Sequence, residues 1–389
     1  MGLGPLSPRV NLEQSRKQAK DLLKAFRAGD AKALDRARWN HPRFRGLTDD
    51  QIGEGPFVLA DAQLVIARLH YFESWPKLLR HIETLERRDP RVGRFEDAAD
   101  AIITGEVATL ERLLRAHPNL IHERSTRAHE APLLHYVAAN GVEDYRQRSP
   151  KNAVEVARVL LDEGAEVDAT SHAYGGGYTV LGLVATSTPP RRAGVQIPLI
   201  DLLVERGAAI DGVRPGASYV RDALSNGCPE AARALADRGA RLDLIAAAGV
   251  GRLDVVQRLV DGASAQELEK ALVTAAGMHG AYDVVEYLLD HGVDVAAGTG
   301  WTALHSATGG ADLRIIDLLI RRGAPLEKRN MYGGTVLGQA LWFAYHGDPA
   351  KVGDYARVIE ALIAAGARTD AYPQMREHIE ETRRRAERG

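Results

Sequence analysis

The sequence predicts an all-α solenoid of about eight helix-turn-helix repeats with short β-turn tips, an N-terminal helical cap and a C-terminal helix. The first observation behind this prediction is a recurring helix stop, in which an apolar, helix-like segment ends in Gly, usually followed by Ala. The stops are Gly164, Gly207, Gly239, Gly262, Gly292, Gly323 and Gly366. They are 23 to 43 residues apart, scattered around the ~33 residues of a two-helix unit. Because each such unit buries its apolar face against a neighbour, the stops predict a stacked array.

The second observation is the internal pattern of the clearest unit, residues 300–330. Thr302 is placed to cap a first helix, because its hydroxyl can accept a hydrogen bond from an otherwise unpaired backbone N–H. The apolar residues between Leu313 and Ile320 have helical spacing and predict a second helix with one buried face. Gly323 follows at the position where a left-handed residue ends a helix, a conformation that Gly adopts without a Cβ clash.

These features carry a family resemblance. Residues 302–305 read TALH and residues 321–324 read RRGA, which resemble the T-P-L-H signature and the helix-ending Gly-Ala of the ankyrin repeat. Residues 132–135 (PLLH) retain Pro and His, whereas residues 179–182 and 335–338 both read TVLG, with Gly in place of His. The resemblance implies that His135 and His305 have a structural role, hydrogen-bonding the backbone of a neighbouring turn.

Two irregularities give further expectations. The shortest interval, from Gly239 to Gly262, predicts a unit too short for a normal first helix. The Gly-rich tips at residues 174–177 and 332–334 each precede a TVLG segment, and their similarity predicts one structural solution used twice.

The ends of the chain differ from the array. Residues 11–92 contain amphipathic helices, including an apolar run from Leu59 and a helix start at Ser74-Trp75-Pro76, and are expected to form a capping subdomain. This segment resembles a helical segment that precedes ankyrin arrays in uncharacterised bacterial proteins. Residues 93–371 are expected to form the array and residues 372–389 a charged C-terminal helix, with residues 1–10 disordered.

Composition excludes several classes of function. The chain has 50 basic and 52 acidic side chains, for a net charge of −2, so no overall field favours nucleic acid or an anionic membrane. Cys228 is the single cysteine, which rules out an intrachain disulfide and fits a reducing, cytoplasmic compartment. The N-terminus lacks the pattern of a secretory signal, and no apolar run is long enough for a membrane span.

Insertions provide the first set of candidate binding residues. Residues 140–152, 187–197 and 346–355 lengthen the connection between the two helices of a unit. The first two belong to neighbouring units, so they are expected side by side on one rim, where they form a locally basic patch. Its candidate residues are Tyr145, Arg146, Lys151, Arg191 and Arg192. Arg and Tyr concentrate binding energy at interfaces. The alternative is that these loops pack on each other and their charges are only solvated.

Aromatic residues form the second set of candidates. Tyr174 and Tyr178 flank the first Gly-rich tip, and Trp301 immediately precedes a first helix. Trp342 and Tyr345 lie late in the inner helix of the last unit. Aromatic side chains in an ankyrin groove are typical partner contacts, although Trp342 could equally fill the interface with the C-terminal helix.

The sequence contains no G-x-x-x-x-G-K-[ST] loop, no H-E-x-x-H pair and no G-x-S-x-G elbow, so no cofactor, metal or catalytic residue is assigned. The leading prediction is a non-enzymatic recognition scaffold that binds a protein or peptide on its concave face and insertion loops. The alternative is a small-molecule-binding protein or enzyme whose pocket is closed by residues 140–152, 187–197 and 346–355.

Overall fold

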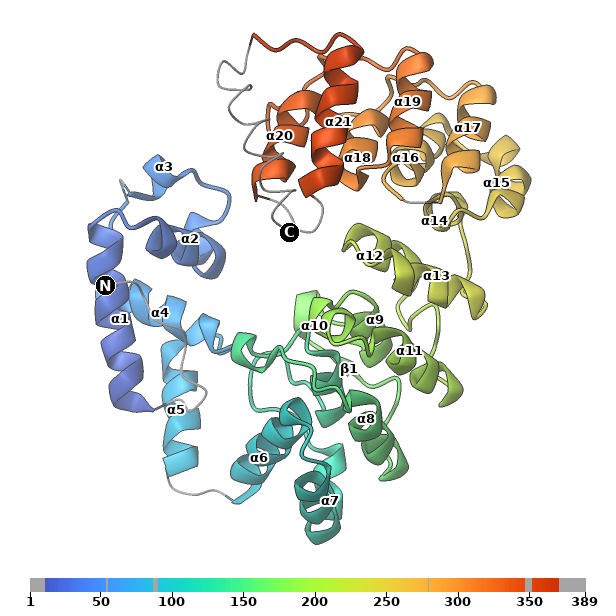
Figure 1. Ribbon diagram of the computed structural model, residues 1–389. Helices are drawn as coiled ribbons and strands as arrows, with labels where there is room; N and C mark the ends of the chain where they lie inside the picture. The colour runs from blue at the N-terminus through green and yellow to red at the C-terminus, as the bar shows by residue number, and fades with distance from the viewer. Residues whose placement is uncertain (1–10, 54, 87–89, 279, 347–351, 371–389) are drawn as a thin grey trace. The chain divides into compact units, whose positions relative to one another are not determined.

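The computed structural model describes residues 11–53, 55–86, 90–278, 280–346 and 352–370 (Figure 1). The predicted termini, residues 1–10 and 372–389, lie outside the described residues. The chain divides into two compact units, residues 1–222 and 223–389. Each unit is built from short helices, and the helical repeat architecture expected from the sequence is confirmed.

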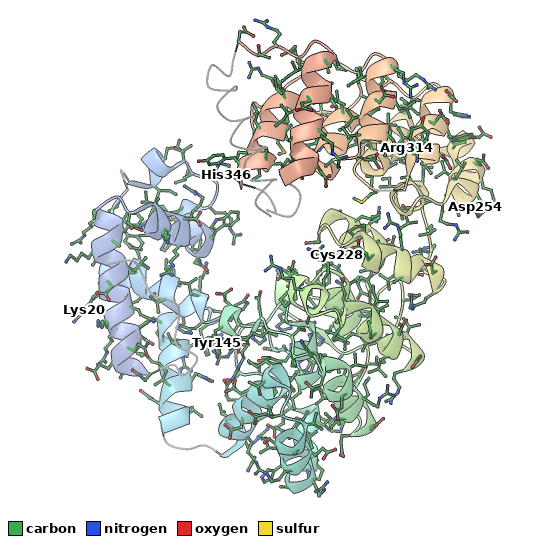
Figure 2. All side chains as sticks on the ribbon, in the orientation of Figure 1. Lys20, Tyr145, Cys228, Asp254, Arg314 and His346 are labelled. Carbon is green, nitrogen blue, oxygen red and sulfur yellow. The ribbon has the colours of Figure 1, made fainter. Side chains whose placement is uncertain are left out.

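The N-terminal helices have a core of their own. Their bounds are α1 Leu12–Arg27, α2 Ala31–Asn40, η1 Pro42–Phe44, α3 Asp49–Gly53, α4 Leu59–Leu69 and α5 Trp75–Glu86. The side chain of Asn11 caps α1, and Lys20 lies on its exposed face (Figure 2). On the buried face, Phe26 stacks on Phe57 with ring centroids 3.9 Å apart. The helix predicted over the apolar run from Leu59 and the helix start predicted at Ser74-Trp75-Pro76 are confirmed by α4 and α5.

The remainder of the first unit consists of paired helices and one small hairpin. Its helices are α6 Pro90–Thr104, α7 Val107–Ala116, η2 Pro118–His122, η3 Leu133–Ala138, η4 Asp144–Arg146, α8 Ala153–Asp162, η5 Ala173–Gly175, α9 Val180–Ala185, α10 Thr188–Arg192 and α11 Gln196–Glu205. The strands β1 Thr170–Ser171 and β2 Tyr178–Thr179 pair antiparallel, with Thr170 opposite Thr179. The first helices of neighbouring pairs are in contact: η3 packs against both α6 and α9.

The second unit continues the same construction after α12 Tyr219–Ser225, which contains the boundary between the two units. Its helices are α13 Pro229–Asp237, α14 Leu244–Val250, α15 Leu253–Leu259, η6 Val260–Gly262, α16 Ala265–Ala276, α17 Tyr282–Asp290, α18 Ala303–Gly310, α19 Leu313–Arg321, α20 Val336–His346 and α21 Val352–Ala364. First helices pack on first helices and second helices on second helices, around one apolar core. The described residues thus contain eight helix pairs: α6–α7, η3–α8, α9–α11, α12–α13, α14–α15, α16–α17, α18–α19 and α20–α21.

The Gly stops behave as predicted at every position but one. Gly164, Gly207, Gly239, Gly292, Gly323 and Gly366 have φ between +84° and +96°, the left-handed region. Gly262 is the exception, because it ends the 3-10 turn η6 outside that region.

This difference in backbone conformation predicts that a Gly→Ala substitution lowers the stability at Gly323 but not at Gly262. Gly323→Ala places a Cβ on a residue with φ +84° and is expected to lower the free energy of unfolding by about 1–2 kcal/mol. Gly262→Ala is the matched control, because its Cβ meets no atom within 4 Å and its backbone is unstrained. Thermal unfolding of both variants checks the prediction, and equal melting temperatures would contradict it.

Two of the sequence expectations about irregular units are wrong. The unit between Gly239 and Gly262 does have a first helix, α14, whose N-terminus is capped by Asp243. The unit is short because Asp243 follows the preceding stop almost directly, which leaves no room for a tip.

The two Gly-rich tips also differ from each other. The first is closed by the β1–β2 hairpin. In the second, Asn330 Oδ1 accepts from the backbone N–H groups of Tyr332 and Gly334, both at 3.0 Å, and Arg329 Nη1 donates to the backbone oxygen of Gly333 at 2.6 Å. Similar sequences therefore reach the same turn position by different hydrogen bonds, because only the second tip is preceded by Asn.

Candidate functional site

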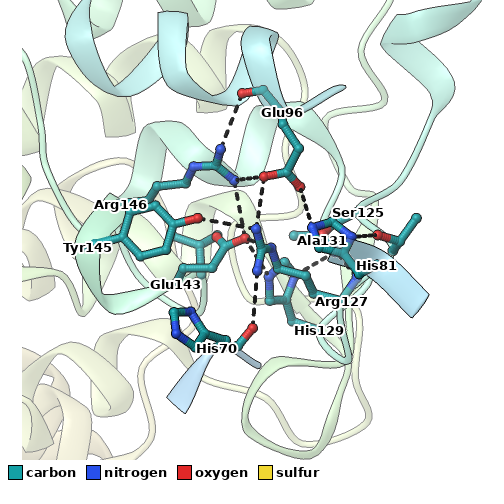
Figure 3. Close-up of polar contacts among 12 residues, drawn as sticks. His70, His81, Glu96, Ser125, Arg127, His129, Ala131, Glu143, Tyr145 and Arg146 are labelled. Carbon is teal, nitrogen blue, oxygen red and sulfur yellow. Dashed lines mark hydrogen bonds and ion pairs between the residues drawn. The ribbon is translucent and has the colours of Figure 1, made fainter. Parts of the chain in front are cut away.

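The first insertion leads into the interior of the first unit. The side chain of Arg146, predicted as part of an exposed basic patch, is 1% exposed. Its guanidinium lies between the carboxylates of Glu96 on α6 and Glu143, at 2.9 and 3.3 Å, and also contacts Asp100 at 2.7 Å (Figure 3). The expectation that Arg146 lies in an exposed patch is thus wrong, because α6 supplies the carboxylates of Glu96 and Asp100, which the chain around the insertion does not reveal.

A second buried arginine completes this cluster. Arg127, in the loop of residues 123–131, donates to Glu96 at 2.8 Å and pairs with Glu143. Its Nη2 also donates to the hydroxyl of Tyr145 at 3.2 Å, which holds that predicted binding residue half-buried. We call Glu96, Arg127, Glu143 and Arg146 the buried ion cluster. Its four charges balance, as a desolvated cluster requires.

The electrostatics of the cluster favour its charged form. Burial alone would raise the pKa of Glu143, but the guanidinium of Arg127 holds it far below its usual range. Burial would likewise lower the pKa of Arg146, and the carboxylates of Glu96 and Glu143 raise it instead. Burial raises the pKa of the Tyr145 hydroxyl to about 12, so it stays protonated. The opposite charges of the four groups therefore stabilise one another, and the cluster is a structural element of the fold.

The cluster also joins the N-terminal helices to the array. His70, at the end of α4, accepts a hydrogen bond on its backbone oxygen from Arg127 Nη1 at 3.2 Å. His81, on α5, has Nδ1 3.0 Å from the hydroxyl of Thr126. We call the contact of residues 70–72 and His81 with residues 123–131 the N-terminal junction.

Other residues of the predicted basic patch remain on the surface. Arg192 and Lys151 are exposed, and Arg191 is exposed beside Arg192 on α10. Asn140, the first residue of the first insertion, donates from Nδ2 to Thr186 Oγ1 at 3.1 Å, one residue before the second insertion begins. Arg146 is buried and is not part of this surface, so the exposed cations of the predicted patch are Lys151, Arg191 and Arg192.

The first Gly-rich tip brings Tyr174 and Tyr178 together as an edge-to-face pair, with ring centroids 6.1 Å apart. The hydroxyl of Tyr174 donates to Asn140 Oδ1 at 2.6 Å, while 65% of this residue remains exposed. Arg214 stacks over the ring of Tyr178 at 4.1 Å. This tip presents an aromatic and cationic surface in which one tyrosine is held in place by the first insertion.

The second unit exposes more aromatic surface. Trp301 packs edge-to-face against Tyr332 of the next tip, with ring centroids 6.4 Å apart, and Tyr332 is 81% exposed. On α20, Trp342 and Tyr345 are 56% and 46% exposed. They are three positions apart on α20, so they share one helix face. The C-terminal segment that could cover Trp342 lies outside the described residues.

A groove of about 1030 Å³ lies elsewhere, between the start of α6, the end of α7 and the loop after η2. Cationic and imidazole side chains dominate its charged lining: Arg91, Arg94, His117, His122 and Arg124. None of the three insertions lines it, so it does not correspond to the pocket on which the alternative function depends. Among the described residues, no group of three or more metal-binding side chains was found.

Comparison with known proteins identifies the repeats. The family described as ankyrin repeats (3 copies) matches residues 244–330. The chain contains ankyrin repeats. A zebrafish (Danio rerio) ankyrin repeat and SAM domain-containing protein 6 is 35% identical over 133 residues, and the ankyrin repeat domain-containing protein SAT10 of Stachybotrys chartarum is 30% identical over 147 residues.

These relatives share only part of their length with this chain. The matches cover 32% and 36% of this chain, but 18% and 7% of the two relatives. The human ASB11 ankyrin repeat domain has 22% sequence identity and a TM-score of 0.38, with 70% of this chain and 98% of that chain covered. The resemblance of the N-terminal segment to bacterial proteins stays a prediction. No helix among the described residues is long and apolar enough to cross a membrane.

Histidines of the ankyrin signature have the predicted structural role. His135 Nε2 lies 2.9 Å from the backbone oxygen of Ala169, and His305 Nε2 lies 3.4 Å from that of Gly334. Thr302 caps its helix by accepting from the backbone N–H of His305.

Where Gly182 replaces this histidine, a neighbouring ankyrin repeat fills the space. The ring of Tyr219 lies 2.4 Å from the position that a Cβ on Gly182 would occupy. The Tyr219 hydroxyl is 3.0 Å from Oγ1 of Thr179, the threonine at the start of α9 that a signature histidine would otherwise contact. In the TVLG segment at residues 179–182, the Tyr219 ring therefore takes the place of the signature histidine.

Sequence reasoning missed most of the buried ion cluster. Glu96 and Arg127 lie on a helix and a loop that carried no candidate residue, and 31 positions separate them. The one available signal was the spacing of Glu143 and Arg146, opposite charges three positions apart within an insertion.

Proposed function

We propose that this protein is a recognition scaffold that binds a protein or peptide partner through its ankyrin repeats. Ankyrin repeats generally serve as protein–protein interaction modules. The observation that carries the proposal for this chain is the exposed pair Trp342 and Tyr345 on one face of α20. Large aromatic side chains that remain exposed together are typical of binding surfaces, because they supply rigid apolar area at low entropic cost.

The aromatic pairs at the tips extend this proposal. Tyr332 with Trp301, and Tyr174 with Tyr178, place further rings on tips of the repeats. Arg191, Arg192 and Lys151 add cationic groups near the first insertion, and we propose them as peripheral contacts. A charged rim of this kind contributes more to association rate and specificity than to affinity.

Binding measurements with surface variants test the proposal. A partner captured from a lysate of the source organism is expected to bind the Trp342→Ala, Tyr345→Ala variant at least about 10-fold more weakly, because truncated aromatic anchors dominate interface energies. Trp39→Ala is the matched control, since Trp39 is 71% exposed on α2, outside the repeats. Equal loss of binding in both variants, or no loss in either, would contradict the proposal.

We also propose that residues 11–92 cap the array formed by residues 93–371. The separate aromatic core of the N-terminal helices and their contacts with residues 123–131 support this division. The single cysteine, Cys228, is buried and forms no disulfide, in accord with a cytoplasmic location.

A further inference from the structure

The N-terminal junction contains three histidines whose rings are removed from solvent. His70 is 1% exposed, His81 5% and His129 2%. The ring atoms His70 Nδ1 and His81 Nε2 are buried without a hydrogen-bond partner. A charged imidazole needs both ring nitrogens to donate. The rings of His70 and His81 are therefore packed as uncharged groups.

The charged groups that face His81 come from three segments: α6, the loop of residues 123–131 and the first insertion. On α6, Glu96 Oε1 lies 3.9 Å from His81 Nε2, the one short contact that favours a charged ring. Against it, the guanidiniums of Arg127 and Arg146 repel a charged His81, and Glu143 adds a weaker attraction. Both carboxylates are already engaged by the two arginines of the buried ion cluster.

The surroundings of His70 likewise oppose a charged ring. His70 faces Arg127, His81 and Glu143, so two of its three charged or titratable neighbours oppose protonation. His129 Nε2 lies 3.7 Å from Glu143, and the ring of Tyr71 meets it edge-on at 5.4 Å. His70 and His81 are the imidazoles that the junction holds uncharged.

We propose that the N-terminal junction is an acid-sensitive interface, docked while His70 and His81 are uncharged and released when they are protonated. Protonation adds positive charge beside Arg127, which spans the junction by donating to the His70 backbone oxygen. Release separates α4 and α5 from residues 123–131 and exposes the buried ion cluster to water, where its ion pairs weaken.

The sign of the pH dependence follows from the pKa values. Burial, followed by repulsion from Arg127, lowers the pKa of His70 from 6.5 to about 4, and the same two causes act on His81. The docked state therefore has its full stability above pH 6.5 and loses it as the pH falls toward 4. Such a shift favours release about 20-fold more at pH 5 than at pH 7 for each histidine.

Backbone strain on both sides of the junction favours the same release. Tyr71 has φ +61° and Glu130 has φ +45°, and neither is a glycine. The backbone oxygen of Tyr71 is held by the N–H of Ala128 at 2.7 Å. Undocking breaks this hydrogen bond and lets Tyr71 relax to an ordinary conformation.

Hydrogen exchange of the full-length protein tests the proposal. Exchange of the Ala128 amide, corrected for the intrinsic effect of pH, is expected to report at least about 20-fold more opening at pH 5 than at pH 7. Amides of α18 in the second unit serve as the internal reference and should stay equally protected at both values. Unchanged protection of Ala128 at pH 5 would overturn the proposal without any variant.

Variants assign the effect to the two histidines. His70→Gln with His81→Gln replaces both titratable rings and is expected to abolish the difference in Ala128 opening between pH 7 and pH 5. His172→Gln is the matched control, since this ring is 65% exposed, lies 3.6 Å from Glu130 and is expected to leave the difference intact. A double variant that keeps the full pH response would also overturn the proposal.

Discussion

Replacing Arg127 by alanine is expected to lower the free energy of unfolding of the first unit by about 3–5 kcal/mol, the usual cost of leaving a buried charge without its partner. The Arg127 side chain is 1% exposed and its partner Glu143 is completely buried. Without Arg127, the carboxylate of Glu143 keeps only Arg146 as a cationic partner, and Glu96 loses its contact at 2.8 Å. The junction with His70 loses a hydrogen bond as well.

A surface pair in the same unit provides the control for Arg127→Ala. Arg206 lies 2.8 Å from Asp162, with the two side chains 30% and 59% exposed. Because water screens this pair, Arg206→Ala is expected to cost about 0–1 kcal/mol. The free energy of unfolding of both variants is measured in urea, with hydrogen exchange of amides in the first unit as the probe. Similar losses for Arg127→Ala and Arg206→Ala would show that the buried ion cluster contributes little.

Restoring the signature histidine at residue 182 is expected to destabilise the protein, by about 1–3 kcal/mol. Gly182→His makes residues 179–182 closer to the ankyrin signature, yet the space is already occupied by the ring of Tyr219. Tyr219 is 1% exposed and its hydroxyl contacts Thr179, so it has no adjacent free volume into which it can move. The family signature alone predicts instead that Gly182→His stabilises the protein.

A double-mutant cycle isolates this effect. Tyr219→Ala alone creates a cavity, and removing a large aromatic side chain from a core costs about 3–5 kcal/mol. In the variant that combines Gly182→His with Tyr219→Ala, the imidazole can enter the vacated space. The combined loss is expected to be smaller than the sum of the single losses by about 0.5–3 kcal/mol. Additive losses, measured by urea unfolding, would show that the two sites are independent.

Much of the fold could be predicted because repeats encode their structure locally. The stop at Gly323, the cap at Thr302 and the helical stripe that follows lie within one unit, and the structure bears out each of them. The prediction failed where one local feature was missing, at α14, because a first helix needs only a cap and an apolar face, and Asp243 supplies the cap.

The candidate site was less predictable because the same residue type can be exposed to solvent or buried in an ion pair. An arginine in an insertion can face solvent, as Arg192 does, or pair with carboxylates inside, as Arg146 does. Whether the arginine is exposed or buried depends on whether a carboxylate from another segment, here Glu96, comes within contact distance. The spacing of residues within an insertion does not contain that information.

By itself, the sequence determined that the chain is a helical repeat array with ankyrin signatures, because capping, helix stops and apolar spacing act within about 30 residues. Only the tertiary structure decided that Arg146 is buried, that Tyr219 replaces a histidine and that Trp342 stays exposed. The physical reason is that burial and ion pairing depend on which segments meet in space. Those contacts join residues such as Glu96 and Arg146, which belong to different helix pairs of the array.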